Sequence, residues 1–338
     1  FVFRSSKKIG EEMMKKEEII KILNNWDIGK IKAIDFIPKG NVNLNWIIST
    51  TKGKFVLRNS HKEYTIRSLK FEFSYLNYLK DHNFPCEITI PLNTSSNNLF
   101  IERKKRFFWL YKFIEGKEIQ REKSSKSNIR EIAYMLAKYH SLLEKSNLEN
   151  NKKKLVSFNK DNLIKDFKYY LKKAKKAPWG NKEKILIEES PKLLSLLPNL
   201  KKIQYNSLKQ YPIHRDLNPE NILWKNNKIK AIIDFDNVGY TKDVLMRDLA
   251  IIIQYFCSYK KRKINLEKVR FFINEYKKHK RVSEEELSII KDLLVSTYIE
   301  DFLYVYWMLI NDKKRSKIER LKKYSKAAQE ISKIDFFL

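Results

Sequence analysis

Glycine is scarce in this sequence: there are seven in 338 residues, where average usage would give roughly two dozen. Each remaining glycine therefore suggests a specific need, such as a tight turn or a close backbone approach. Gly40, Gly53, Gly116 and Gly239 all lie at expected turns beside the polar residues discussed below. We expect these four positions to mark the loops around a functional site.

Cysteine and long apolar runs are also scarce. Cys86 and Cys257 lie far apart without metal-ligand spacing, which excludes a disulfide framework or a zinc site and favours a reducing, cytoplasmic location. The apolar stretch 295–310 is too short to span a membrane and contains Glu300 and Asp301. The first residues contain no apolar segment of signal-peptide length, so we expect neither a membrane span nor export.

Negative charge is outnumbered, because 70 Lys and Arg face 40 Asp and Glu and leave a net charge of +30. Such a surface attracts polyanions at low salt. The lysines are nevertheless spread along the chain, without a long basic run interleaved with aromatic residues. This pattern favours a solvated surface over a dedicated nucleic-acid site, and it gives no prediction of the oligomeric state.

The hydrophobic pattern predicts an α+β protein. An amphipathic helix at 11–25 and a long helix at 65–82 accompany five short strands, and most of the remaining chain has helical periodicity. The expected strands are 31–37, 43–50, 54–59, 98–103 and 106–113, and the later helices are 129–143, 163–174, 184–197, 244–259, 265–279, 284–311 and 316–333. We predict a five-stranded antiparallel sheet with one long helix in residues 1–114 and a mainly helical lobe in 115–338.

The segment 211–236 carries the most specific motif. Residues 214–221 satisfy the pattern H-R-D-x-x-x-x-N, and a short hairpin then returns Asp234 towards Asn221. Asp216 can orient a substrate hydroxyl or accept its proton, while Asn221 and Asp234 offer hard oxygen ligands for Mg²⁺. This set predicts phosphoryl transfer; the alternative is a polar loop and hairpin that match the pattern by chance.

Candidates for binding the nucleotide precede this segment. The loop containing Gly40, Asn41 and Asn43 can fold over phosphates through its backbone N–H groups, although an ordinary turn has the same composition. Arg58 ends a strand and can grip phosphate oxygens with its fork, the alternative being a surface arginine. Glu72 lies beside the apolar stripe of the long helix and is expected to pair with Arg58 unless it is solvated.

These motifs resemble the aminoglycoside phosphotransferase and choline-kinase-like family, whose members are relatives of protein kinases that phosphorylate small molecules. The resemblance covers most of the chain and rests on Gly40, Asn43 and Asn45, on Phe55-Val56-Leu57-Arg58, Glu72, Phe113-Ile114-Glu115-Gly116, the helix 133–140, the catalytic loop and Asp248-Leu249-Ala250. It implies a two-lobed protein-kinase-like fold that uses ATP or GTP with Mg²⁺. It also implies Asp216 as catalytic base, Asn221 and Asp234 as metal ligands, and Leu110, Tyr111 and Lys112 as the adenine-contacting hinge.

Two positions depart from the protein-kinase pattern. Arg58 stands where a lysine is usual, which keeps the charge but not the shape. Asp236 replaces the glycine of D-F-G and can contact a second metal ion or the substrate. Because Asp248 follows Asp234 closely, no long activation loop intervenes, and we expect a small-molecule acceptor instead of a protein.

The acceptor is the least determined feature. Tyr298, Glu300 and Asp301 on a late helix are candidates for the pocket wall, although aromatic residues at helical spacing usually belong to a core. The first loop and the segment 113–116 look most like the homoserine-kinase-like branch, which implies the hydroxyl of homoserine or another amino alcohol. The alternatives are an aminoglycoside or sugar kinase, or a non-catalytic scaffold of the spore-coat type that binds an anionic partner.

Overall fold

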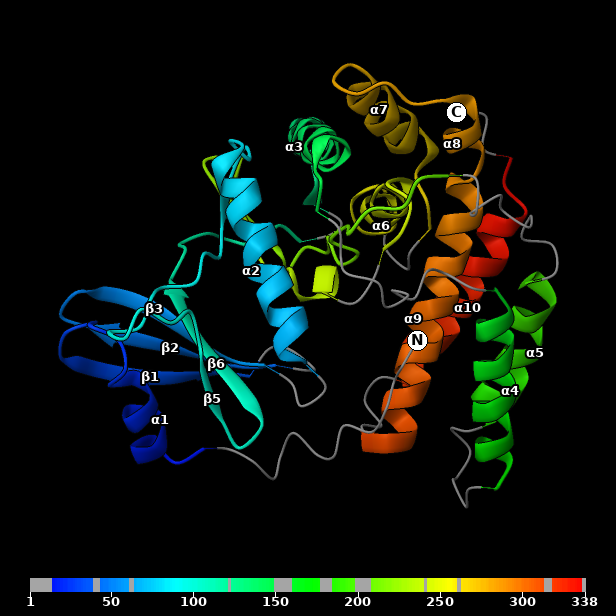
Figure 1. Cartoon of the computed structure of the whole chain (residues 1–338). Helices are drawn as coiled ribbons and strands as arrows, with labels where there is room; N and C mark the ends of the chain where they lie inside the picture. The colour runs from blue at the N-terminus through cyan, green and yellow to red at the C-terminus, as the bar shows by residue number, and fades with distance from the viewer. Residues whose placement is uncertain are drawn as a thin grey trace.

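The computed structural model describes residues 14–38, 43–60, 64–120, 123–148, 160–176, 184–197, 208–239, 242–259, 263–312 and 318–335. Two expected site residues, Gly40 and Asn41, and the start of the first expected helix lie outside these ranges. The chain forms two lobes, with the strands gathered in one and most helices in the other (Figure 1).

The N-terminal lobe contains the predicted five-stranded antiparallel sheet. Its strands lie in the order β1-β2-β3-β6-β5, and each neighbouring pair is antiparallel. The strands are β1 (Ile31–Ile37), β2 (Leu44–Thr50), β3 (Gly53–Asn59), β5 (Ile101–Arg103) and β6 (Arg106–Lys112). The consecutive hairpins that join β1, β2 and β3 explain why local patterning sufficed to predict this part of the sheet.

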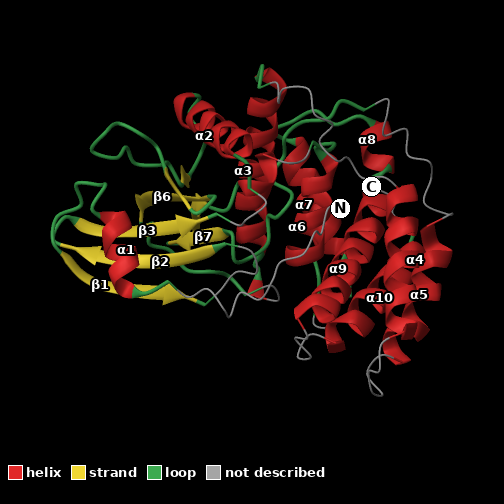
Figure 2. Cartoon of the chain, turned by 60° about the horizontal axis from the view of Figure 1, so that its bottom comes forward, coloured by secondary structure: helices red, strands yellow, loops and turns green. Residues whose placement is uncertain are grey.

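The two faces of the sheet are buried by different helices. Alternate residues such as Trp46 and Leu57 form one apolar cluster with helix α1 (Lys16–Leu23), which crosses the strands in Figure 2. On the other face, Trp109 packs edge-on against Phe73 of helix α2 (Ile66–Asp81). We call these the outer and the inner face. Figure 1 shows α2 between the sheet and the helical lobe.

A second sheet joins the two parts of the chain; the sequence predicted its hairpin between Asn221 and Asp234 but not its third strand. Strand β4 (Glu87–Ile88) pairs in parallel with β8 (Lys228–Ile232), which is itself antiparallel to β7 (Ile222–Lys225). With only two residues, β4 is too short to show an alternating pattern. Gly116 lies where the chain leaves β6 and passes β7, and a Cβ there would be 2.7 Å from Cβ of Leu223. Close approach therefore accounts for this glycine.

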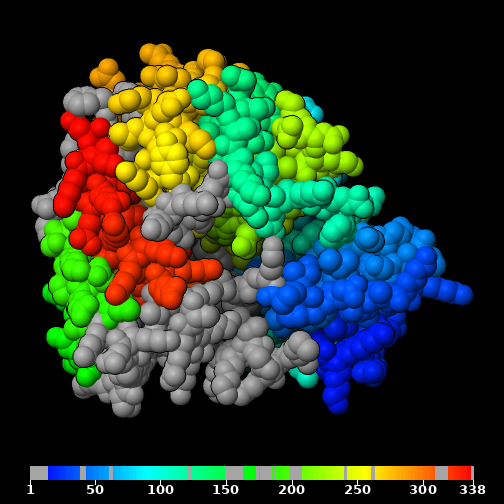
Figure 3. Space-filling model, turned by 180° about the vertical axis from the view of Figure 1, so that it is seen from behind, coloured from blue at the N-terminus to red at the C-terminus, as the bar shows by residue number. Residues whose placement is uncertain are grey.

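The remaining chain is mainly helical, as predicted. Its helices are α3 (Lys126–Lys145), α4 (Lys160–Lys176), α5 (Lys184–Leu196), α6 (Met246–Phe256), α7 (Leu266–Lys277), α8 (Glu284–Ser288), α9 (Ile290–Asp312) and α10 (Ile318–Ser332). The single helix expected at 284–311 is in fact two, because the chain breaks at Ile289. Figure 3 shows the reverse side, with α10 in red and the N-terminal lobe in blue at opposite edges.

Helix α9 lies against α6, α4 and α10 and carries much of this core. Tyr298, Phe302 and Tyr306 on α9 are fully buried. Across the described ranges, none of the helices is both long enough and apolar enough to cross a membrane.

Candidate active site

The loop before β7 is held in its shape by His214. The backbone N–H of Asp216 donates to Nδ1 of His214 at 3.2 Å, and Nε2 of His214 lies 3.0 Å from the carbonyl of Ile233. Because a backbone N–H can only donate and a carbonyl can only accept, the proton must sit on Nε2. Burial lowers the pKa of His214, which favours this neutral form. The histidine thus ties the loop to the residue that precedes Asp234.

Two amides fix the carboxylate of Asp216. Asn218 Nδ2 donates to Oδ1 at 2.8 Å, and Asn221 Nδ2 donates to Oδ2 at 2.9 Å and to the Asp216 carbonyl at 2.8 Å. Burial raises the pKa of Asp216 well above its usual range, and the neighbouring Asp234 raises it further, against the hydrogen bond from Asn218. A fixed carboxylate with an increased affinity for a proton is suited to receive one from a hydroxyl.

Asn221 and Asp234 fit a magnesium ion by their chemistry and placement. Since Nδ2 of Asn221 faces Asp216, its Oδ1 points elsewhere and accepts no hydrogen bond from the described residues. The N–H of Ile233 donates to the Asn221 carbonyl at 3.0 Å, so the end of the hairpin lies beside Asn221. Asp234 then adopts a left-handed conformation with φ of 68°, a strained geometry that is common at functional sites.

The described residues contain no group of three His, Cys, Asp or Glu side chains that could hold a metal ion. Mg²⁺ is usually held by one or two carboxylates and completes its shell with water and phosphate oxygens, so Asn221 and Asp234 would be the protein ligands here.

Arg58 does not pair with Glu72, which corrects the expected partnership. Its Nη2 instead donates to Oδ1 of Asp234 at 2.5 Å and to Oδ2 of Asp236 at 3.1 Å. Glu72 is buried and accepts a hydrogen bond from the hydroxyl of Tyr64. Burial raises the pKa of Glu72 to about 7, although the nearby guanidinium of Arg58 opposes this shift. Arg58 therefore pairs with Asp234 and Asp236, which follow β8. It does not pair with Glu72 of α2, whose raised pKa reduces its negative charge.

Asp236 connects the two lobes. Besides Arg58 of β3, it accepts a hydrogen bond from Nδ2 of Asn43 at 2.9 Å. Burial and the adjacent Asp234 raise the pKa of Asp236 to about 6, while Arg58 lowers it. Of the expected phosphate-binding loop, Asn43 therefore contacts the segment that follows β8 and lies beside the expected metal ligand Asp234, whereas Gly40 and Asn41 lie outside the described residues.

The three expected hinge residues do not share one environment. Leu110 is fully buried in the outer-face cluster, and its carbonyl accepts a hydrogen bond from the N–H of Leu92 at 2.8 Å. Tyr111 lies on the inner face beside Trp109, with ring centroids 5.0 Å apart, and burial raises its pKa to about 12. The side chain of Lys112 points to the outer face. Of the three side chains, only that of Tyr111 is on the side of Arg58.

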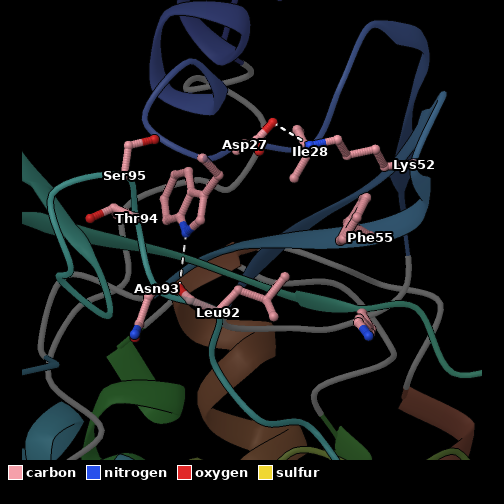
Figure 4. A pocket seen from close by; sticks show the side chains of 10 residues that line it. Asp27, Ile28, Lys52, Phe55, Leu92, Asn93, Thr94 and Ser95 are labelled. Atoms are coloured by element: carbon pink, nitrogen blue, oxygen red, sulfur yellow. Dashed lines mark hydrogen bonds and ion pairs between the residues drawn. The ribbon is translucent and has the colours of Figure 1, made fainter.

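A cavity of about 380 Å³ lies on the outer face of the sheet, and Figure 4 shows the side chains that line it. Trp26, Phe55, Leu92 and Lys112 line it, and the indole Nε1 of Trp26 donates to the Leu92 carbonyl at 3.0 Å. Lys52 and Asp27, which also line it, form an ion pair at 2.6 Å. Because its walls come from separate segments of the N-terminal lobe, no local motif could have indicated it.

The four residues expected to contact the substrate lie in different surroundings. Tyr298 is fully buried in the core, with its ring near that of Tyr324. Glu300 binds Nη2 of Arg215 at 3.1 Å and lies 3.6 Å from Nη2 of Arg247. Glu300 therefore supports the catalytic loop through Arg215, whereas Tyr298 belongs to the core.

Asp236 and Asp301 lie near Asp216 itself. Both carboxylates contribute to the raised pKa of Asp216. Asp301 is partly buried on α9 and accepts a hydrogen bond from Nε2 of Gln254 at 2.6 Å. The structure thus surrounds Asp216 with acidic groups from two different segments.

Sequence reasoning missed a buried ionic network under the catalytic loop. Arg247 donates to Oδ2 of Asp243 at 3.2 Å and to Oγ of Ser296 at 2.7 Å, so it joins α6 to α9. Arg215 approaches the same Asp243 carboxylate at 3.4 Å, and its backbone N–H donates to Oδ1 of Asp248 at 2.8 Å. Arg215 has φ of 59°, a conformation that these contacts stabilise. The sequence offered little indication of this network, because only Arg215 and Asp248 among its members belong to recognisable motifs.

A two-lobed fold of this kind, with an Asp, Asn and Asp set where the lobes meet, defines a phosphotransferase of the kinase-like type. The sequence model of the phosphotransferase enzyme family matches residues 33–280, so the chain belongs to that family and is a small-molecule kinase. The resemblance inferred from the motifs is thereby confirmed.

The individual proteins that match this chain do so at low sequence identity. The chain is 23% identical over 287 residues to a homoserine kinase of Rhizobium meliloti, covering 85% of this chain and 82% of the relative. It is 26% identical over 269 residues to a homoserine kinase of Bartonella henselae, covering 79% of this chain and 78% of the relative.

Among solved structures, an amicoumacin kinase in complex with AMP-PNP and Ca²⁺ has a TM-score of 0.69 at 13% identity. The match covers 95% of this chain and 96% of that structure. A microcompartment-associated aminopropanol kinase has a TM-score of 0.68 at 12% identity, and the match covers 94% of this chain and 96% of that structure. These structures support the fold.

Proposed function

We propose that this kinase transfers the γ-phosphate of ATP to the hydroxyl of a small amino alcohol or hydroxy amino acid, with homoserine as the first candidate. The observation that carries the proposal is the carboxylate of Asp216, held on both oxygens by Asn218 and Asn221. Phosphoryl transfer depends on positioning and charge neutralisation, and a fixed carboxylate beside a metal site supplies the positioning of the acceptor.

The nucleotide is proposed to lie under the inner face of the sheet. Arg58 and the loop ending at Asn43 would contact its phosphates, and Tyr111 would border the base. Asn221 and Asp234 would hold Mg²⁺, which when bound neutralises charge on the phosphates. A structural relative was solved with AMP-PNP and Ca²⁺, which supports the use of ATP. The lobes 1–114 and 115–338 are proposed as the nucleotide-binding and the catalytic, substrate-binding units.

The acceptor is proposed from charge and from the relatives. Asp301 and Asp236 lie close enough to Asp216 to raise its pKa, so an ammonium group near the reacting hydroxyl would be stabilised there. The curated relatives named above are homoserine kinases, and one structural neighbour is an aminopropanol kinase. A second candidate is an aminoglycoside, because a spectinomycin phosphotransferase shares the fold with a TM-score of 0.68. Both acceptor classes carry amines next to hydroxyls.

A phosphotransfer screen tests these assignments. The purified protein is incubated with Mg²⁺, ATP or GTP, and homoserine, aminopropanol, choline, a sugar or an aminoglycoside, and nucleoside diphosphate release is measured. We expect the highest kcat/KM with ATP and a small amino alcohol or homoserine. Asp216→Asn should abolish turnover while leaving nucleotide binding largely intact. Unchanged turnover in that variant would rule out Asp216 as the base.

A non-catalytic scaffold is the alternative from another class. A thermal shift on addition of Mg²⁺ and ATP separates the two, because only a protein that binds the nucleotide is stabilised. The absence of any shift, together with no turnover for any acceptor, would favour the scaffold.

A further inference from the structure

Helix α2 comes between β3 and β4 in the sequence, but its core contacts divide between the two lobes. Tyr75, Leu76 and Leu79 are fully buried in the large apolar cluster that α3, α6 and α9 build in the helical lobe. Leu69 and Phe73 belong to a separate, smaller cluster on the inner face of the sheet. The helix is therefore part of the core of the helical lobe as well as a cover for the sheet.

The polar contacts of α2 distinguish the two sides. The hydroxyls of Tyr75 and of Tyr139 on α3 are hydrogen-bonded at 2.5 Å, and the hydroxyl of Tyr78 donates to the Leu142 carbonyl at 2.9 Å. Across the described residues, none of the hydrogen bonds or ion pairs of α2 side chains ends on a strand of the five-stranded sheet. A hydrogen bond fixes direction as well as distance, whereas apolar contact is non-directional. The orientation of α2 is thus fixed by α3, and its contact with the sheet permits sliding.

Both ends of α2 are also held by the helical lobe. Near its start, Ser68 lies against the short 3₁₀ helix Asp236–Gly239, and a Cβ at Gly239 would be 2.9 Å from the Ser68 carbonyl oxygen. After its end, the ring of Phe84 packs edge-on against that of Tyr139 with centroids 5.7 Å apart, and β4 then pairs with β8. The segment 66–90 therefore contacts the helical lobe along its whole length.

We propose that the protein moves as two units that do not follow the order of the chain: α2 and β4 belong to the unit of the helical lobe, and the five-stranded sheet with α1 moves against both. Tyr75 and Tyr78 hold α2 in that unit through their hydroxyls. The T-shaped contact between Phe73 and Trp109, with centroids 5.2 Å apart, is part of the surface along which the sheet slides.

This movement changes access to the candidate site. Asn43, which precedes β2, and Arg58 of β3 bind Asp236 from the side of the sheet. A displacement of the sheet separates these groups from Asp236, while α2 keeps its place beside the segment that follows β8. This division of the protein does not depend on which nucleotide or acceptor the kinase uses.

Distances between pairs of spin labels, measured by double electron–electron resonance, test the division. Labelled cysteines replace the exposed residues Asn77 of α2, Lys32 of β1 and Asn274 of α7, in a background in which Cys86 and Cys257 are changed to Ala. Helix α7 packs on α3 and serves as the reference in the helical lobe. We expect the distance distribution of Lys32–Asn274 to be about twofold broader than that of Asn77–Asn274, because only the first pair spans the moving boundary. Equal widths, whether broad or narrow, would overturn the proposal.

A pair within the sheet shows the width that the labels themselves contribute. Lys32 and Glu102 are exposed on β1 and β5, the two edge strands. Their distance distribution should be as narrow as that of the α2–α7 pair. A broad distribution would place the movement inside the sheet and would contradict a rigid sheet unit.

Removal of the hydroxyls tests what holds α2. In the double variant Tyr75→Phe and Tyr78→Phe, the distribution of Asn77–Asn274 should broaden, and that of the pair within the sheet should not. Tyr134→Phe removes an exposed hydroxyl from α3 and should change neither. If the double variant does not fold, Tyr78→Phe replaces it, with a smaller broadening expected. An unchanged Asn77–Asn274 distribution would refute the role of the hydroxyls.

The opposite side of α2 is tested by Phe73→Leu. This change reduces the contact with Trp109 and leaves the hydrogen bonds to α3 in place. The distribution of Lys32–Asn274 should broaden further, and that of Asn77–Asn274 should stay the same. The reverse result would assign α2 to the sheet and overturn the proposal.

Discussion

Asn221 holds Asp216 through one amide nitrogen, which donates to both the backbone carbonyl at 2.8 Å and the carboxylate Oδ2 at 2.9 Å. The residue proposed to bind metal therefore also orients the residue proposed as base. This arrangement links metal binding to the position of the acceptor hydroxyl, since a movement of Asn221 would shift both the proposed metal ligand and the carboxylate of Asp216.

Substitutions of the two asparagines should separate these roles. Asn218→Ala removes the hydrogen bond to Oδ1 of Asp216 and the acceptor of the Glu220 N–H, but no proposed metal ligand, so kcat should fall about tenfold with the Mg²⁺ dependence unchanged. Asn221→Ala loses both the support of Asp216 and a metal ligand, so kcat should fall about 10²-fold to 10³-fold and more Mg²⁺ should be needed for half-maximal rate. Initial rates over a Mg²⁺ titration measure both effects. An identical Mg²⁺ requirement in the two variants would argue against Asn221 as a ligand.

His140 should make the folded protein sensitive to acid. It is fully buried on α3, its Nδ1 lies 2.8 Å from the hydroxyl of Tyr276, and burial lowers its pKa, although Asp248 at 3.6 Å opposes the shift. In the unfolded chain the imidazole takes up a proton near about pH 6.5, whereas the folded form stays neutral to lower pH. Unfolding therefore binds a proton below that pH, and stability falls as the pH falls.

The variant His140→Gln isolates this contribution from the carboxylates that titrate in the same range. Urea unfolding between pH 7.5 and 5 should show the wild type losing more stability on acidification than the variant, by at most about 1.4 kcal/mol per pH unit. Parallel stability curves for the two proteins would show that His140 does not titrate on unfolding.

Arg247 should be essential for stability. Its side chain is 1% exposed and contacts Asp243, which is fully buried, together with Ser296 and the carbonyl of Leu293. Arg247→Met leaves a buried carboxylate with less compensation, so unfolding free energy should fall by about 3–5 kcal/mol. Lys326→Met breaks an exposed pair with Glu330 and should change it by less than about 1 kcal/mol. Chemical denaturation measures both, and similar losses in the two variants would refute the assigned role of burial.

Gly116 should not tolerate a methyl group. A Cβ at this position would lie 2.7 Å from Cβ of Leu223 and 3.4 Å from the backbone N of Trp224, so Gly116→Ala must push β7 away from the segment that leaves β6. Overpacking of this kind typically costs about 1–3 kcal/mol. Glu115→Ala, the exposed neighbouring position, should leave the unfolding midpoint nearly unchanged. A Gly116→Ala protein as stable as the wild type would show that the two segments separate easily.

The local geometry of the catalytic segment could be predicted from the sequence. Asp216, Asn221 and Asp234 lie within twenty residues of one another, and one short hairpin decides how they meet. The hairpin strands β1 to β3 and the helix α2 were equally predictable, because their apolar periodicity and turn residues act over short distances. The motif pattern also sufficed to recognise the family.

The partners of the long side chains depended on how the lobes pack. Arg58 lies 176 residues from Asp234 in the chain, and only the tertiary structure decided that it contacts that carboxylate in place of Glu72. The same holds for Glu300, which supports Arg215 from behind, and for Asp301, which lies near Asp216. The sequence by itself determined which chemical groups are present and which of them are neighbours along a loop or hairpin. The packing of α2 beside Asp236–Gly239 and of α9 beside Arg215 decided which charges meet, because a buried charge takes whichever partner the surrounding elements bring within reach.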